Sequence, residues 1–64
     1  MPRTALKRAA RDLHGYAKDA RTLALRRPTP EIVAAMRARL SGARAALERA
    51  EKALEELEQG GERQ

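Results

Sequence analysis

The feature that most constrains this chain is a pair of prolines near its middle, in the segment 26–30 (Arg-Arg-Pro-Thr-Pro). A proline disfavours α conformation in the residue before it, so Arg27 should lie outside any helix that precedes it. Thr29 also precedes a proline, and the extended conformation this favours is the one that an N-cap residue needs. Pro30 then suits the first helical position, and Glu31 suits the positive end of the helix dipole. The segment therefore predicts a break between two helices.

The second helix is expected to run from about residue 30 to 59 and to stop at the following pair of glycines. Its apolar residues recur with a heptad period, which is typical of a coiled-coil helix. One row consists of Val33, Leu40, Leu47 and Leu54, and the other of Met36, Ala43, Ala50 and Leu57. We expect both rows to lie in one seam.

The first helix is expected to cover about 3–25, with apolar residues at the same spacing. Because the connection (26–29) is short, the two helices should be antiparallel neighbours. The predicted fold class is all-α: a single two-helix antiparallel hairpin of coiled-coil type, with a disordered tail over 60–64. The predicted core seam consists of Leu6, Leu13, Tyr16, Leu23, Val33, Met36, Leu40, Leu47, Leu54 and Leu57.

The turn also predicts which residues face each other across the hairpin. Tyr16 should lie level with Leu40, and Asp19 should lie near Arg39. A pair of exposed opposite charges contributes only about 0–1 kcal/mol, so its role would be to fix register.

Gly15 and Gly42 fall level with each other in this register, one in each predicted helix. Each costs about 1 kcal/mol in a helix interior relative to alanine. Both are expected on outward positions. We interpret them as tolerated glycines, although a close approach by another helix is the alternative.

The chain is too small to bury a large core, and the usual reinforcements of small domains are missing. It has 64 residues, no cysteine and one aromatic residue, so disulfides and cysteine-bound zinc are excluded. Idealised helix packing or oligomerisation remains. Leu25 and Ile32 lie off the predicted seam near the turn and are candidates for an association surface. We expect two hairpins to form a four-helix bundle, most simply a homodimer, unless another protein covers the surface.

Basic side chains line one face of the first predicted helix. The net charge of the chain is +5, and residues 1–27 hold eight of its basic side chains and two acidic ones. The candidate surface for an anionic partner consists of Lys7, Arg8, Arg11, His14, Lys18 and Arg21. Such a row could contact successive phosphates of DNA or RNA without reading bases. An ordinary solvated helix face is the alternative, and no known nucleic-acid-binding motif accompanies the row.

Nothing in the sequence suggests catalysis, a metal, a cofactor or a small-molecule substrate. His14 is the only histidine and has basic helical neighbours, whereas a general base needs an orienting carboxylate and a nearby nucleophile. The glutamates of the second helix lack the histidines that a bundle metal site uses. No apolar run could span a bilayer, so we expect a soluble, cytoplasmic protein without a membrane partner.

The sequence therefore favours a non-enzymatic helical hairpin that mediates protein–protein interaction, as a scaffold, an adaptor or a small regulator. The alternative is a small basic regulator that binds nucleic acid through its first helix.

Overall fold

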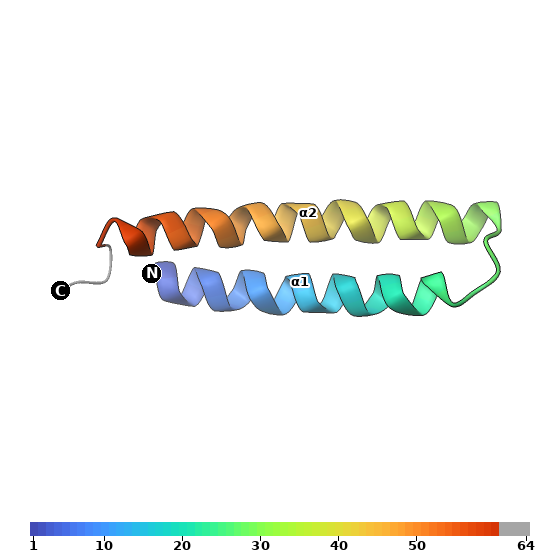
Figure 1. Ribbon diagram of the computed structural model, residues 1–64, viewed down its shortest axis with the longest axis horizontal. Helices are drawn as coiled ribbons and strands as arrows, with labels where there is room; N and C mark the ends of the chain where they lie inside the picture. Colours follow the sequence, from blue (N-terminus) through green and yellow to red (C-terminus); the bar gives the residue numbers. More distant parts are fainter. Residues whose placement is uncertain (61–64) are drawn as a thin grey trace.

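Two antiparallel α-helices make up the part of the chain that the structure describes, residues 1–60 of a computed structural model (Figure 1). Helix α1 covers Pro2–Ala24 and helix α2 covers Pro30–Glu58, so each end lies within one residue of its predicted position. The helices lie side by side and give a rod about 51 Å long. Most of the predicted disordered tail, from residue 61 on, lies outside the described residues.

The prolines and Thr29 define the start of α2 as predicted. Thr29 is extended (φ −77°, ψ 163°), and its side-chain oxygen accepts a hydrogen bond of 3.2 Å from the backbone N–H of Ile32. Pro30 follows at the start of the helix, where its missing N–H leaves no carbonyl unsatisfied. At the other end Gly60 adopts a positive φ of 82°, a conformation that glycine reaches without a steric penalty. Local sequence therefore determines both ends of α2.

Alanines form the centre of the contact between α1 and α2. Ala9, Ala46 and Ala53 are 1%, 0% and 2% exposed, and no larger side chain among residues 1–60 is as deeply buried. The larger residues of α1 (Leu6, Leu13, Tyr16 and Leu23) are half-buried around this line, as are Met36 and Leu57 of α2. Small residues at the centre allow two helix backbones to approach closely.

The predicted seam is wrong for one of its two rows on α2. Val33, Leu40, Leu47 and Leu54, which we call the leucine row, are 45%, 55%, 46% and 47% exposed. The buried Ala46 and Ala53 each precede a member of this row by one position. Because one residue turns a helix by about 100°, the line of contact with α1 is turned away from the leucine row. The apolar surface of α2 is broader than a single neighbouring helix can cover.

The candidate association residues also differ from each other. Ile32 is half-buried, and its backbone N–H donates to the side chain of Thr29 that caps α2. Leu25 is 82% exposed. Leu25 is therefore the more exposed of the two.

Gly42 corrects a further expectation, because it does not face outward. It is half-buried, and an added Cβ would lie 2.5 Å from Cζ of Tyr16 and 2.9 Å from its Cδ1. Tyr16 thus lies against Gly42. Gly15 has open space around it, as expected of a tolerated surface glycine.

Candidate functional site

One long edge of the hairpin is stabilised by ion pairs between the two helices. Nε of Arg39 lies 3.3 Å from Oδ2 of Asp19, and Nη1 of Arg49 lies 3.2 Å from Oδ2 of Asp12. The first pair was predicted from the turn. All four side chains are substantially exposed, so each pair contributes at most about 1 kcal/mol. The pairs match the register of the two helices. Their side chains along this edge are therefore engaged in contacts within the hairpin.

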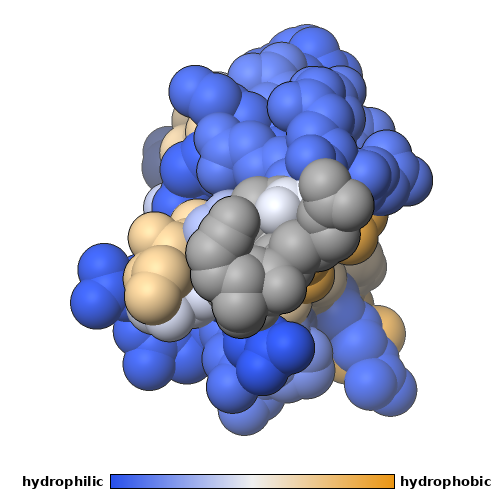
Figure 2. Space-filling model, turned by 90° about the vertical axis from the view of Figure 1, so that its left-hand side faces the viewer, coloured by the Kyte–Doolittle hydropathy of each residue, from blue (hydrophilic) through white to orange (hydrophobic). Residues whose placement is uncertain are grey.

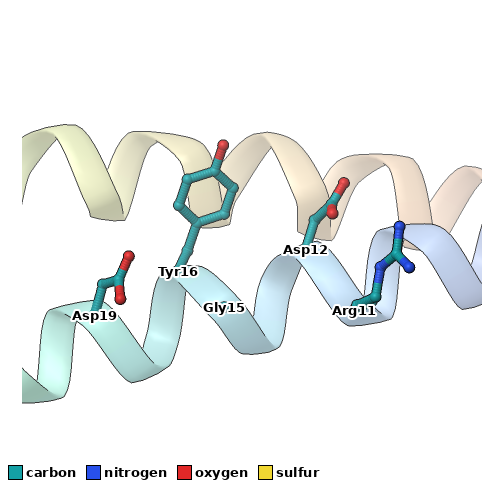
Figure 3. A pocket seen from close by; sticks show the side chains of 5 residues that line it. All are labelled: Arg11, Asp12, Gly15, Tyr16 and Asp19. Carbon is teal, nitrogen blue, oxygen red and sulfur yellow. The ribbon is translucent and has the colours of Figure 1, made fainter.

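A shallow hollow of about 350 Å³ lies on the same edge, over Gly15 (Figure 3). Asp12, Tyr16 and Asp19 extend from α1 toward α2 along it, while Arg11 lies at its end. The space at the Cβ position of Gly15 is open. Because both carboxylates already pair with arginines of α2, this hollow has the character of a surface depression rather than of a binding site.

The opposite edge is apolar and is open on α2. Helical periodicity places the leucine row on the side of α2 away from Arg49 and its partner Asp12. In the end-on view of Figure 2 the most strongly hydrophobic residues appear on the right-hand side, in the angle between the helices. Isolated exposed leucines are common on proteins, but a continuous row along a helix is typical of an interaction site.

Helix α1 extends this apolar edge. Leu6 and Leu13 are half-buried beside α2, and Ala17 and Ala24 are exposed on the same side of α1. Near the turn the two helices share an open hollow of about 380 Å³, whose apolar lining includes Leu23, Ala24, Val33, Met36 and Leu40. We call this combined surface of α1 and α2 the apolar face. It runs along the hairpin and includes the leucine row.

Four charged residues of α2 border the leucine row on the side away from α1. Each follows a member of the row by four positions, so it lies on a neighbouring strip of the helix surface. They are Arg37, Arg44, Glu51 and Glu58. Arg37 and Arg44 line a hollow of about 360 Å³ together with Leu40. None of these four residues was predicted to belong to a site, although their spacing relative to the heptad repeat could have revealed the border.

The predicted basic surface is exposed in full, but one of its members stands apart. Lys7, Arg11, His14, Lys18 and Arg21 share the face of α1 that points away from α2, over roughly 20 Å. We call these five residues the basic stripe. Arg8 instead lies at the edge toward α2, where it lines a hollow with Arg49, Lys52 and Glu56. Within residues 1–60, no member of the basic stripe forms an ion pair.

The environment of His14 does not resemble a catalytic site. It lines a surface hollow with Ala17, Lys18 and Arg21, so its charged neighbours there are basic. Across residues 1–60, no three histidine or acidic side chains gather in a way that could hold a metal ion. Neither α1 nor α2 combines the length and the apolar character that a bilayer-crossing helix requires.

These features define the molecule as an α-helical hairpin with one ion-paired edge, one uncovered apolar face and an outward basic stripe. No protein-family model matches the chain, and no curated protein or solved structure matches it either. The surfaces themselves are therefore the basis for inferring a function.

Proposed function

We propose that this chain is a non-enzymatic protein–protein interaction module that works through its apolar face. The observation that carries the proposal is the exposure of the leucine row on a hairpin whose helices are already paired with each other. Contiguous apolar surface on a folded protein is unfavourable in water, and burial by a partner stabilises it by roughly 25 cal/mol per Å² of apolar area removed from water.

The partner that fits such a face is itself helical. A row with heptad spacing accepts the side chains of a facing helix between its members, as in coiled coils and helical bundles. Two hairpins packed face to face would give a four-helix bundle, in which every helix gains a second neighbour. A scaffold, an adaptor or a small regulator could each use this geometry.

A photo-crosslinking experiment tests whether the apolar face binds protein. A diazirine leucine analogue would replace Leu47 in the middle of the leucine row. A matched variant would carry the same analogue in place of Ala45, which is exposed on a different side of α2. After irradiation in cell extract and in purified solution, crosslinked products would be identified by mass spectrometry.

The proposal predicts protein crosslinks from position 47 that are several times more abundant than those from position 45. The crosslinked chain can be another copy of this protein or a different protein, since both bury the face. Equal yields from the two positions, with helicity unchanged, would rule out the apolar face as the working surface.

We propose as a second candidate that the basic stripe binds nucleic acid. The observation in its favour is that five basic side chains lie along one straight helix face without ion pairs to residues 1–60. Neutralising phosphates releases counterions, so binding should weaken steeply as salt increases. Anisotropy titrations of labelled duplex DNA and structured RNA across a salt series would measure that slope.

A quadruple variant with glutamine in place of Lys7, Arg11, Lys18 and Arg21 supplies the comparison. It should lose most of the affinity and most of the salt slope while keeping its helicity, because all four side chains are exposed. If wild type and variant bind equally weakly at low salt, the basic stripe is a solvated helix face.

A further inference from the structure

We propose that the apolar face pairs with the same face of a second copy of this chain, with the two α2 helices antiparallel about a two-fold axis at Leu47. This inference rests on the proposed function, and it specifies the partner and the orientation. Four charged residues beside the leucine row supply the evidence for the orientation.

The charges along the border of the leucine row change sign at its middle. Arg37 and Arg44 come first, and Glu51 and Glu58 follow at the same seven-residue interval. The sign of the charge changes between Arg44 and Glu51, which lie on either side of Leu47. Within residues 1–60 none of the four forms an ion pair, so all of them are available to a partner. A surface with this order of charges is complementary to a reversed copy of itself.

A two-fold rotation about an axis at Leu47, perpendicular to α2, brings these charges together. Arg44 then lies opposite Glu51 of the second copy, and Arg37 lies opposite Glu58 of the second copy. The symmetry repeats both contacts, because a two-fold interface uses the same patch on both chains. In antiparallel helix pairs, residues at equivalent flanking positions face each other along the edge of the seam, so charge at these positions sets orientation.

The same rotation matches the apolar residues. Leu47 lies beside Leu47 of the second copy, and Leu40 lies opposite Leu54 of the second copy. The ion pair between Asp12 and Arg49 shows that this level of α2 corresponds to the middle of α1. The axis therefore passes near Leu13, and the two α1 helices also overlap along most of their length. Both ends of the hairpin contribute to one four-helix bundle.

Other orientations place like charges together. Parallel α2 helices in register would set Arg37 beside Arg37 and Glu58 beside Glu58 of the second copy. Packing α2 against α1 of the second copy would bring Arg37 level with Arg21 of that helix and Glu51 level with Lys7, so that arrangement pairs only part of the border with opposite charge. Like charges placed across an interface disfavour the arrangement. The antiparallel α2 pair is the arrangement that satisfies all four border residues.

Single cysteines provide a direct test, because the natural chain contains none. Leu47→Cys places a thiol on the axis, so two copies should form a disulfide quickly under mild oxidation. Leu40→Cys alone should crosslink poorly, because two copies of that residue would be roughly 20 Å apart along the helix axis. Mixing Leu40→Cys with Leu54→Cys should give the heterologous disulfide. Ala45→Cys, on a different side of α2, is the matched control for random collision.

Charge exchange tests the border independently. The double variant Arg37→Glu/Arg44→Glu makes the border entirely acidic, and Glu51→Arg/Glu58→Arg makes it entirely basic. Each variant alone should dissociate at least tenfold more readily than wild type in sedimentation equilibrium. An equimolar mixture of the two should recover association as a heterodimer, since every contact again pairs opposite charges.

The expected result is a wild-type dimer with self-crosslinking at position 47 alone and restored association in the charge mixture. A monomer at every concentration, or a yield at position 47 no greater than at position 45, would overturn self-pairing. Equal self-crosslinking at positions 40, 47 and 54 would overturn the antiparallel orientation. A monomer that still photo-crosslinks a different protein from position 47 would refute this inference and leave the proposed function intact.

Discussion

The ring of Tyr16 lies against Gly42 of the facing helix, where an added Cβ would displace the ring. A Cβ at position 42 would lie within 3 Å of three ring atoms. The only aromatic residue of the chain therefore packs on a glycine of the facing helix. This contact, together with the buried alanines, determines how closely α1 and α2 approach.

Gly42→Ala should lower the free energy of unfolding even though alanine is the better helix former. Alanine gains about 1 kcal/mol in helix propensity. Displacing the ring of Tyr16 should cost about 1–3 kcal/mol, as other overpacked contacts do. We expect a net loss of about 1 kcal/mol, measured by urea denaturation. In a Tyr16→Ala background the same substitution should instead stabilise the chain, and a loss of equal size there would show that the ring is not responsible.

Gly15→Ala is the matched substitution on the other helix, and it should have the opposite sign. Gly15 lies in mid-helix with open space around the position of a Cβ. Without a clash, only the propensity gain remains, about 0.5–1 kcal/mol. Thermal unfolding should show a higher midpoint for this variant. A lower midpoint would contradict this prediction, because it would show that an added methyl group disrupts a contact at Gly15.

Thr29→Ala should shorten or destabilise the start of α2. The substitution removes the side-chain acceptor for the N–H of Ile32 and should reduce stability by about 1 kcal/mol. Thr29→Ser keeps the acceptor and serves as the control, with stability close to wild type. Circular dichroism during denaturation measures both. If the two variants behave alike, the prolines alone define the helix start.

Ala46→Leu and Leu47→Gln, at adjacent positions, should act on different contacts. Ala46 is 0% exposed between the helices, so a leucine there would force α1 and α2 apart at a cost of about 1–3 kcal/mol at every protein concentration. Leu47 is 46% exposed, so its substitution should affect mainly the part of the stability that rises with protein concentration. Denaturation at several concentrations separates the two effects. A concentration-independent loss for Leu47→Gln would place Leu47 in the hairpin core.

Substitution of the ion pair between Asp19 and Arg39 should have little effect on stability. Both side chains are well exposed, and such pairs contribute about 0.2–1 kcal/mol. A double-mutant cycle with Asp19→Asn and Arg39→Gln should give a coupling energy in that range that shrinks in high salt. A coupling energy well above 1 kcal/mol would indicate that a partner buries this edge.

The elements of the fold followed from local sequence, because their causes are local. The prolines end one helix and start the next, and the side chain of Thr29 caps α2 by accepting a hydrogen bond from the residue three positions later. The contact between Asp19 and Arg39 followed from the length of the turn. The leucine row was placed wrongly because a heptad repeat identifies an apolar strip without identifying which neighbour covers it. The border residues Arg37 and Glu58 were overlooked for the same reason, since their role at an interface depends on which apolar row is exposed.

The sequence by itself determined that this chain forms two helices, where they begin and end, that they are antiparallel and that basic residues line the outer face of the first. Each of these properties depends on contacts or charges close together in the chain. Only the tertiary structure decided that Ala46 and Ala53 are buried against α1 while Leu47 and Leu54 remain about half exposed at the edge of that contact. This arrangement depends on how closely the two helix backbones can approach. The buried alanines of both helices and the contact of Tyr16 with Gly42 together determine that distance.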